Sequence, residues 1–358
     1  MSKNKLKNKV VTVVGARPQF IKLAPLSEGL RSHFHEVIIH TGQHYDETMS
    51  KVFFDELEIN KPDYNLEVGS GSHAIQTAQM MIRIEEVLLI EKPSLVIVFG
   101  DTNSTLAAAL VASKLGIKII HIEAGLRSFN RSMPEELNRI ATDHLSDYLF
   151  VPTNTAEKNL VNEGLIDRIE NTGDIMVDSV SYFLEKSKNR SRILYHMDLK
   201  KNNYYLLTLH RPSTVDDVSL LSKILNDLNN LGKKIIFPIH PRTKKVFKKI
   251  KLPKKNNFIF LNPAGYLDFL NLMSNAKKII TDSGGIQKEA YILKTPCVTL
   301  RTETEWVETV DNGWNLLLNP NSKNISLQID SFITPESQKK LFGENPSLKM
   351  INKLLEII

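Results

Sequence analysis

Residues 94–125, SLVIVFGDTNSTLAAALVASKLGIKIIHIEAG, decide the fold of this 358-residue chain. Apolar runs at 95–99 and 118–122 flank a helix-length segment at 105–115. The apolar residues in both runs are largely consecutive, which is typical of strands buried on both faces of a parallel sheet. The segment therefore predicts a strand–helix–strand unit whose two strands lie parallel.

The same alternation continues on both sides of this segment, and it predicts an α/β protein with parallel sheets covered by helices on both faces. Further strands are predicted at 10–14, 37–40, 148–151, 168–171, 205–209, 234–239, 258–261, 278–281 and 297–300. Further helices are predicted at 19–31, 74–90, 135–145, 216–231 and 285–293.

Length and motif placement divide the chain into two domains. At about 150 residues per domain, the length corresponds to about two. The chemistry-bearing turns fall into one group before residue 145 and another after residue 205. We therefore expect an N-terminal domain at 1–172 and a C-terminal domain at 173–345. The last segment, 346–358, has a helical pattern and is a candidate to pack back on the first domain.

Composition excludes several classes of protein. Hydrophobic residues make up 42% of the chain and charged residues 24%, as in a folded globular protein. No apolar run approaches the roughly 18 residues of a membrane span, so no membrane insertion is expected. The stretch MSKNKLKNK leads into a short strand and lacks the long apolar segment of a signal peptide. These features predict a cytoplasmic protein.

The cysteine and histidine content predicts no metal site. Cys297 is the only cysteine, which excludes a disulfide framework and a Cys-rich metal centre. No matching carboxylate pattern accompanies His33, His35, His40 and His44.

A net charge of +6 favours anionic partners in general. Much of the excess lies at 243–255, where lysines surround apolar residues as on the solvated face of an amphipathic helix. No stacking aromatics alternate with basic residues, so we expect no nucleic-acid partner.

The first glycine-containing turn is GARPQFIK at 15–22, between a predicted strand and a predicted helix. Gly15 permits a tight turn, Pro18 suits a first helical turn, and the amide groups there attract phosphate. Arg17 and Lys22 add positive charge. The alternative is an ordinary strand–helix connection with a surface arginine.

The second such turn is TDSGGIQKEA at 281–290. Gly284 and Gly285 let backbone amides approach a diphosphate, and Ser283 supplies a hydroxyl donor. Glu289 is placed to reach ribose hydroxyls. The alternative is an N-capped helix without a ligand. Neither turn is a GxGxxG or a Walker loop, which argues against dinucleotide binding and ATPase activity.

Carboxylates at strand ends predict acid–base chemistry. Asp101 follows the strand at 95–99, Glu123 follows the next strand, and Glu135 and Glu136 open a later helix. Carboxylates near one another at adjacent strand ends suit proton transfer. Asp101 is alternatively a helix cap, and Glu135 and Glu136 alternatively favour a helix dipole. Glu123 leads into a loop and has no such structural explanation.

Two histidine–arginine pairs end strands in the second half of the chain. His210 and Arg211 follow one strand, and His240 and Arg242 follow another. Such pairs suit contacts with phosphate or with a leaving group. Either histidine is alternatively a structural hydrogen-bonding residue.

Taken together, these turns resemble the non-hydrolysing UDP-N-acetylglucosamine 2-epimerases, including the branch that acts on UDP-2,3-diacetamido-uronic acids. The matching segments follow the family's order over about residues 10–310. They are GARPQFIKLAP, TGQHYD, GDTNSTLAAA, HIEAGLRS, MPEELNR, LHRP, HPRT, DSGGIQKEA and PCVTLRTETEW.

The resemblance implies two Rossmann-like domains that face a central cleft, the glycosyltransferase-B architecture, and a homodimer. It implies a UDP-sugar substrate, no cofactor, and a role in supplying precursors of surface polysaccharides. The family's catalytic positions correspond to Asp101, Glu123, Glu135 and His210. The substrate-binding candidates are Arg17, Lys22, Arg211, His240, Arg242, Ser283, Gly284, Gly285, Glu289 and Arg301.

The implied chemistry is epimerisation at carbon 2 through loss of UDP to a glycal and its return. The first alternative is the same reaction on UDP-2,3-diacetamido-2,3-dideoxy-glucuronic acid. A hydrolysing 2-epimerase and a UDP-sugar glycosyltransferase remain further alternatives. A non-catalytic nucleotide-sugar sensor would have no need for three carboxylates at strand ends.

The chain departs from the family pattern at two positions. Pro212 follows His210-Arg211 where the family commonly has glutamate, so no role of that glutamate is carried over. Asp46 stands where members regulated by a second substrate molecule tend to have glutamine, so that regulatory site is not carried over either.

Overall fold

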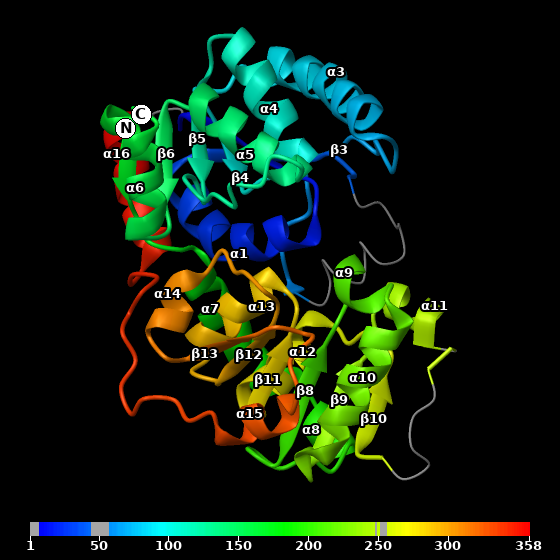
Figure 1. Ribbon diagram of the computed structural model, residues 1–358. Helices are drawn as coiled ribbons and strands as arrows, with labels where there is room; N and C mark the ends of the chain where they lie inside the picture. The colour runs from blue at the N-terminus through cyan, green and yellow to red at the C-terminus, as the bar shows by residue number, and fades with distance from the viewer. Residues whose placement is uncertain (1–6, 44–56, 248, 251–255) are drawn as a thin grey trace. The chain divides into compact units, whose positions relative to one another are not determined.

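The computed structural model describes residues 7–43, 57–247, 249–250 and 256–358. The chain forms two compact units: unit 1 is Met1–Ser179 with Phe342–Ile358, and unit 2 is Val180–Leu341. Each unit contains a parallel β-sheet with helices packed on it, so the predicted α/β class is confirmed (Figure 1). The division expected from the sequence, into an N-terminal domain at 1–172 and a C-terminal domain at 173–345, remains a prediction.

Unit 1 contains a seven-stranded parallel sheet in the order β3-β2-β1-β4-β5-β6-β7. Its strands are β1 Lys9–Val14, β2 His35–His40, β3 Tyr64–Asn65, β4 Leu95–Phe99, β5 Lys118–Ile122, β6 Tyr148–Val151 and β7 Ile169–Asn171. Its helices are α1 Arg17–His33, α3 His73–Glu91, α4 Asn103–Lys114, α5 Pro134–Leu145, α6 Asn154–Asn162, η1 Ile166–Arg168 and α16 Pro346–Ile357. Helix α7 Met176–Arg190 crosses into unit 2.

Helices α3, α4 and α5 pack against one another on one side of this sheet (Figure 1). A cluster of buried side chains joins Val11 and Val98 of the sheet to Ile84 of α3 and Ala108 of α4. Burying an isoleucine of this kind stabilises the fold by about 1.5–3 kcal/mol relative to exposure. This core holds β1, β4 and β5 against α3 and α4.

Helix α16 packs against α1 and so joins the C-terminal segment to unit 1. Gly29 of α1 faces Ile351, which leaves space for the close approach of the two helices. Lys353 forms an ion pair with Glu170 of β7 at 2.6 Å. The two ends of the described chain lie side by side, because the Asn8 side chain donates to the carbonyl of Ile358 at 2.5 Å (Figure 1).

Unit 2 contains a six-stranded parallel sheet in the order β10-β9-β8-β11-β12-β13. Its strands are β8 Tyr204–Thr208, β9 Lys234–Pro238, β10 Phe258–Leu261, β11 Lys278–Thr281, β12 Cys297–Leu300 and β13 Asn315–Leu318. Its remaining helices are α8 Ile193–His196, α9 Pro212–Val215, α10 Val218–Leu228, η2 Asn229–Leu231, α11 Pro241–Phe247, α12 Tyr266–Asn275, α13 Gly284–Ile292, α14 Val307–Asp311 and α15 Ile325–Ser331.

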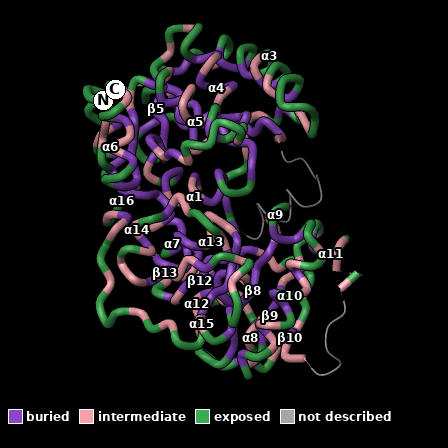
Figure 2. The backbone as a smooth tube through the Cα atoms, in the orientation of Figure 1, coloured by how far each residue is buried: buried purple, intermediate pink, exposed green. Residues whose placement is uncertain are grey.

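Side chains of β8 alternate between two cores, as the strand period requires. Tyr205 and Leu207 join the cluster that contains α10, whereas Tyr204 and Leu206 join the cluster that contains α12. Figure 2 shows the strands of both units as buried segments and the exposed residues on the outer sides of the helices. Within the described residues, no helix is long and apolar enough to cross a membrane.

Candidate functional site

Two neighbouring turns at the carboxyl edge of the unit 1 sheet have unusual backbone geometry. Gly100 follows β4 with φ +64°, and Glu123 follows β5 with φ +74°. The two strands pair in parallel from Leu95↔Lys118 to Phe99↔Ile122, so the turns lie next to each other. A positive φ costs a residue such as glutamate about 1–2 kcal/mol, and such outliers cluster at functional sites.

The Glu123 carboxylate forms an ion pair with the Nζ of Lys22, which comes from α1. Only 12% of the Lys22 side chain and 8% of the Glu123 side chain are exposed. A Cβ atom on Gly100 would lie 3.3 Å from Glu123 Oε2 and 3.7 Å from Lys22 Nζ, so glycine leaves room for this pair. The structure thus brings two of the predicted site residues into contact.

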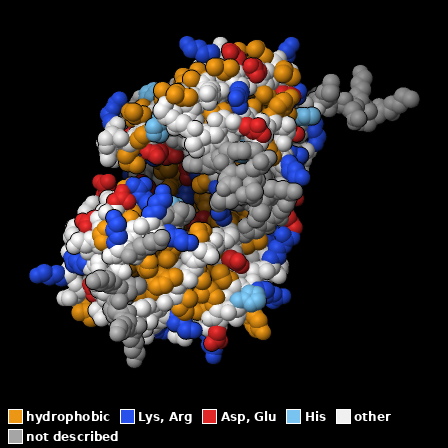
Figure 3. Space-filling view, turned by 90° about the vertical axis from the view of Figure 1, so that its right-hand side faces the viewer, with side chains coloured by type: hydrophobic (Ala, Val, Ile, Leu, Met, Phe, Trp, Pro, Cys, Tyr) orange, Lys and Arg blue, Asp and Glu red, His pale blue; other side chains and the backbone are white. Residues whose placement is uncertain are grey.

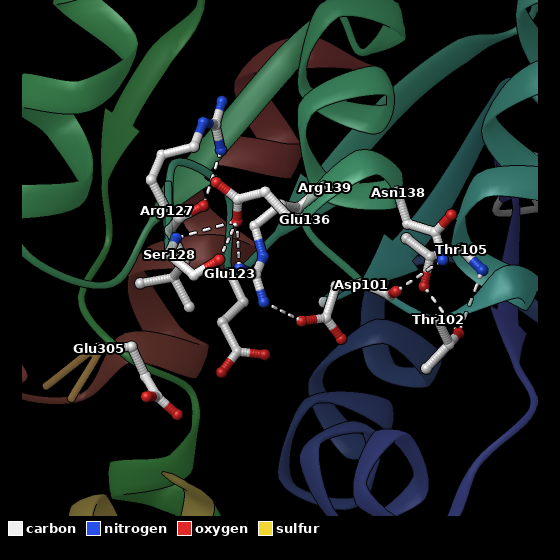
Figure 4. A network of polar contacts seen from close by, with 12 residues as sticks. Asp101, Thr102, Thr105, Glu123, Arg127, Ser128, Glu136, Asn138, Arg139 and Glu305 are labelled. Atoms are coloured by element: carbon white, nitrogen blue, oxygen red, sulfur yellow. Dashed lines mark hydrogen bonds and ion pairs between the residues drawn. The ribbon is translucent and has the colours of Figure 1, made fainter. Parts of the chain in front are cut away.

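Asp101 lies beside this pair and forms an ion pair with Arg139, which was not predicted as a site residue. Arg139 of α5 donates to the Asp101 carboxylate at 2.5 Å and to Glu136 at 2.5 Å (Figure 4). Asp101 is not the cap of α4, because Thr102 occupies the N-cap and accepts from Thr105 N. The interpretation of Asp101 as a capping residue is therefore wrong. Arg139 is the last residue of the segment MPEELNR, three residues after Glu136. This short spacing on a predicted helix could have identified it as a partner of the carboxylates.

Glu135 and Glu136 have different environments. Glu136 is buried and accepts hydrogen bonds from Ser128 N and Oγ, both at 2.9 Å, and from Phe129 N at 2.8 Å (Figure 4). Burial raises the pKa of Glu136, but these bonds and Arg139 outweigh it, so the pKa is lowered. Glu136 therefore holds the loop before α5, whereas Glu135 is exposed in the first turn of that helix.

Arg17 is the first residue of α1, and its side chain is exposed near the carboxyl end of β1. In the sheet order β1 is the neighbour of β4, so Arg17, Asp101 and Glu123 follow three adjacent strands. The side chain of Gln19 forms hydrogen bonds to the turn after β1 and to the end of β4. Its Oε1 accepts from Gly15 N at 2.7 Å, and its Nε2 donates to the carbonyl of Phe99 at 2.8 Å.

In unit 2, a buried aspartate organises the turn that carries His210. The Asp282 carboxylate accepts from the backbone amides of His210 and Arg211, each at 3.0 Å. It also lies 3.2 Å from His210 Nδ1. Asp282 directly follows β11 and precedes Ser283, so it links the β8 turn to the β11 turn. Asp282 lies in the motif at 281–290 but was not predicted as a site residue.

The start of α13 is a site with positive character. Its N-cap Ser283 makes no side-chain capping bond within the described part of the chain. A Cβ on Gly284 would lie 1.9 Å from Glu305 Oε1, so a larger residue there would displace the Glu305 carboxylate. Arg301 donates to Glu305 at 2.7 Å, and Arg211 lies 3.9 Å from it.

Two arginines, Arg211 and Arg301, lie close to Glu305. Burial raises the pKa of Glu305, but the neighbouring arginines, Arg301 first, lower it overall. The pKa of Arg211 is lowered by burial and by the charge of Arg301. Asp282 and Glu303 also act on Arg211 by their charge. The two guanidinium groups and the backbone amides at this helix N-terminus are donors that suit a phosphate group. Gly285 lies in the first turn of the same helix.

The remaining predicted residues of unit 2 differ in their environments. Glu289 is almost fully buried and accepts from the hydroxyl of Tyr266 at 2.9 Å. The ring of His240 lies 5.6 Å from that of His210, and burial, with the charge of His210, lowers the pKa of His240.

Arg242 is engaged outside this cluster. It donates to both oxygens of Asp216 at 3.0 and 2.7 Å, and both side chains are exposed. The structure therefore does not bring Arg242 to the start of α13.

No group of three or more potential metal ligands occurs among the residues that the structure describes. His44, considered as a metal ligand, and Asp46, at the position of a regulatory glutamine, lie outside the described residues.

Comparison with known proteins gives one consistent result. Residues 29–356 match the family model described as UDP-N-acetylglucosamine 2-epimerase. A "UDP-N-acetylglucosamine 2-epimerase homolog" from Methanococcus maripaludis is 54% identical over 353 residues, which are 97% of this chain and 99% of that protein. The UDP-2,3-diacetamido-2,3-dideoxy-D-glucuronate 2-epimerase of Pseudomonas aeruginosa is 45% identical over 318 residues, 87% of this chain and 88% of that protein.

Among solved structures, the UDP-GlcNAc 2-epimerase of Methanocaldococcus jannaschii, crystallised with UDP-GlcNAc and UDP, superimposes with a TM-score of 0.87. The two chains are 44% identical, and the match covers 98% of this chain and all of the other.

Proposed function

The chain belongs to the UDP-N-acetylglucosamine 2-epimerase family, and we propose that it inverts carbon 2 of UDP-N-acetylglucosamine without releasing free sugar. One observation carries the proposal beyond family membership. Glu123 has a positive φ, is mostly buried, and is paired with Lys22 beside the turn that carries Asp101. This geometry supports a carboxylate positioned for proton transfer.

The hydrogen on carbon 2 is not acidic enough for direct removal. We propose that the bond between carbon 1 and the β-phosphate oxygen breaks first, with its electron pair leaving on UDP. Positive charge at carbon 1 then makes the carbon 2 proton removable, and its transfer to a carboxylate gives a glycal. Protonation of carbon 2 from the opposite face and return of UDP to carbon 1 complete the reaction. No oxidation occurs, so this route uses no nicotinamide.

In unit 1, we assign proton transfer to Asp101, Glu123 and Glu135. A proton leaves carbon 2 on one face of the sugar and another returns on the opposite face, so the reaction needs acid–base groups in different positions. Three carboxylates, from two strand ends and one helix, are the candidates. Lys22 orients Glu123, and Arg139 orients Asp101. No face of the sugar is assigned to any of the three carboxylates.

In unit 2, we assign UDP binding to the start of α13 and the arginines beside it. The amides of Ser283, Gly284 and Gly285 suit the diphosphate, with Arg211 and Arg301 neutralising its charge. Charge that develops on the departing UDP is stabilised by such fixed donors. The remaining assignments are His210 to the leaving group, Glu289 to the ribose, and Arg17, Lys22 and His240 to further UDP-sugar contacts.

The test is incubation of the protein with UDP-N-acetylglucosamine in deuterated water, followed by NMR. The proposal predicts deuterium at carbon 2 of both epimers, each recovered as the UDP-sugar with no build-up of free sugar. Release of N-acetylmannosamine would instead indicate a hydrolysing enzyme. Absence of deuterium with this substrate would overturn the assigned activity.

A second substrate deserves the same assay, because the Pseudomonas relative named for the diacetamido-glucuronate is 45% identical. Parallel reactions with UDP-N-acetylglucosamine and with UDP-2,3-diacetamido-2,3-dideoxy-glucuronic acid compare kcat/KM. We expect the higher value for UDP-N-acetylglucosamine. A higher value for the uronic acid would transfer the proposal to that substrate.

We also propose that the protein is a homodimer that pairs through α3. Ile75, Ile82 and Leu89 recur every seven residues on this helix and are 59%, 60% and 56% exposed. Figure 3 views the side of unit 1 that carries α3 and shows hydrophobic side chains among charged ones. A repeated apolar stripe of this kind is typical of a helix with a partner, and a second copy supplies a matching one.

The test of the dimer is the molar mass measured by light scattering after size-exclusion chromatography. The wild-type mass is expected to be twice the 40.6 kDa of one chain, and Ile82→Glu is expected to reduce it to one chain. The matched control is Leu327→Glu, at a leucine on α15 that is 67% exposed. A wild-type mass of one chain would contradict the dimer.

A further inference from the structure

We propose that His121 is a positioning residue that holds the two turns carrying Asp101 and Glu123, through two hydrogen bonds that it donates. The inference rests on the proposed function, because it concerns the placement of the carboxylates assigned to proton transfer. His121 lies on β5, two residues before Glu123, and its side chain is fully buried. It does not reach the solvent and so has no direct role with substrate.

Both ring nitrogens of His121 face acceptors. Nε2 lies 2.7 Å from the carbonyl oxygen of Gly100, which has no proton to give, so Nε2 donates. Nδ1 lies 2.6 Å from Asp143 Oδ1. Asp143 also accepts from the amide of Gly125 at 3.1 Å and from Arg127 Nη1 at 2.7 Å. A carboxylate with these donors is ionised, so Nδ1 donates as well and the ring carries both protons.

The charges around this pair balance, which makes a buried imidazolium tenable. Arg127 pairs with Asp143 and, through two bonds of 2.7 and 2.8 Å, with Glu163. Two cations and two carboxylates therefore form one network that is buried except at Glu163, where 27% of the side chain is exposed and His144 of α5 lies at 3.3 Å. Burial raises the pKa of Asp143, but His121 and Arg127 lower it overall. Charge-assisted bonds of this kind are stronger than neutral ones.

The network joins both turns at the backbone. His121 anchors the carbonyl of Gly100, the residue directly before Asp101. Asp143 anchors the amide of Gly125, two residues after Glu123. Gly100, Glu123 and Gly125 all have positive φ, at +64°, +74° and +79°. Backbone in this region persists where its surroundings fix it, and His121 and Asp143 supply the buried side-chain contacts of these turns, beside backbone bonds such as that from Gly100 N to the carbonyl of Ile122.

Two amide substitutions separate the two bonds. His121→Gln places its amide near the position of Nε2, so the bond to Gly100 is retained and the bond to Asp143 is lost. His121→Asn places its amide near Nδ1, so the bond to Asp143 is retained and the bond to Gly100 is lost. Each variant keeps one polar contact, and neither introduces a cavity of more than a few atoms.

The experiment measures kcat, KM and melting temperature for both variants with UDP-N-acetylglucosamine. We expect kcat to fall about 10²-fold in His121→Asn, because small misplacements of reacting groups cost that much. We expect kcat to fall less than about tenfold in His121→Gln, with KM little changed in both variants. His121→Asn is expected to melt no lower than His121→Gln, because it keeps the charge-assisted bond. Equal losses of kcat, or losses that follow melting temperature, would overturn the positioning role.

A second measurement does not depend on activity. Nitrogen-15 NMR of the wild-type imidazole is expected to show N–H protons on both ring nitrogens of His121 at neutral pH. Only one N–H would overturn the inference. An inactive wild-type protein with both N–H protons present would contradict the proposed function and leave the doubly donating histidine in place.

Discussion

Glu123 combines three properties that seldom occur in one glutamate. It has a positive φ, its side chain is mostly buried, and its carboxylate is paired with Lys22. Positive φ alone does not distinguish Glu123, because the exposed Glu58 and Glu67 share it, so its burial and its pairing with Lys22 carry the argument. This combination is consistent with selection for the position of the carboxylate rather than for stability.

Replacing Glu123 by glutamine keeps the size of the side chain and removes its proton-accepting charge. We expect deuterium incorporation at carbon 2 to fall by at least about 10²-fold, the usual contribution of a general acid or base. The affinity for UDP, measured by calorimetry, is expected to stay within about twofold, because UDP is assigned to unit 2.

The control is Glu28→Gln, the same chemical change at an exposed glutamate of α1. It is expected to exchange deuterium at the wild-type rate. An active Glu123→Gln variant would remove Glu123 from the proton-transfer set.

Gly100→Ala tests the close approach at the neighbouring turn. The new Cβ would lie 3.3 Å from Glu123 Oε2, and the residue would have to keep a φ of +64°. We expect a loss of stability of about 1–2 kcal/mol from the backbone alone. The rate of epimerisation is expected to fall further than this loss explains, because the carboxylate must move.

The matched control for Gly100→Ala is Gly116→Ala, where φ is +69° and no atom lies within 4 Å of the new Cβ. Urea denaturation and kcat are measured for both variants. An equal effect of the two substitutions on kcat would show that the space around Gly100 is unimportant.

At the scale of elements, α5 connects the site residues of unit 1. Its successive turns present Glu136, Arg139 and Asp143, which bind the loop at Ser128, the Asp101 carboxylate and His121. The spacing of three and four residues places these side chains on one face of the helix. A rotation of α5 would therefore disturb all three contacts together.

The pH dependence of stability tests the buried end of α5. The pKa of Asp143 is lowered below its ordinary value, so its contribution to stability is fully present above about pH 4 and is lost as pH falls through the lower, native value. We expect Asp143→Asn to cost about 3–5 kcal/mol at neutral pH, because it leaves buried cations uncompensated. The difference in melting temperature between wild type and Asp143→Asn is expected to shrink as pH falls below about 4. A difference that is constant with pH would contradict this account.

The sequence was sufficient to predict the elements whose apolar pattern is local. The predicted strands 95–99 and 118–122 coincide with β4 and β5, because their apolar residues are consecutive and nearly all buried. β13 was missed, because only part of NLLL is buried in this edge strand. α7 was missed, because no helix was predicted at 173–203, although Phe183 on it is fully buried.

The same limit applies to the site. Strand ends identified Asp101 and Glu123, since the carboxyl edge of a parallel sheet can be located from local sequence. The partners Lys22 and Arg139 depend on how α1 and α5 are rotated on the sheet, which is a tertiary property. His121 was interpreted as part of a strand, and only the structure shows that it carries two hydrogen bonds between the turns.

At the scale of the whole molecule, the C-terminal helix belongs to the first half of the fold. Met350, Ile351 and Leu354 of α16 are buried, and the helix packs on α1, which carries Lys22. The chain thus leaves unit 1, forms unit 2, and returns to unit 1 at Phe342. Changes at the C-terminus are therefore expected to affect unit 1.

Leu354→Ala tests this assignment. A buried leucine replaced by alanine costs about 2–5 kcal/mol. Hydrogen exchange measured by mass spectrometry is expected to become faster in peptides from α1 and β1, and to stay unchanged in peptides from β8 to β12. The matched variant, Leu228→Ala in the core of α10, is expected to give the reverse pattern. Faster exchange throughout both units for either variant would contradict two separately packed cores.

The central claim is that UDP leaves and returns during each turnover. UDP-N-acetylglucosamine carrying oxygen-18 between carbon 1 and the β-phosphorus tests it directly, because rotation of the β-phosphate in released UDP makes its oxygens equivalent. Phosphorus-31 NMR of the recovered UDP-sugar is predicted to show the label in non-bridging positions, at a rate at least equal to that of epimerisation. Epimerisation with the label still wholly in the bridge would contradict a mechanism in which UDP leaves carbon 1 and its β-phosphate rotates before UDP returns.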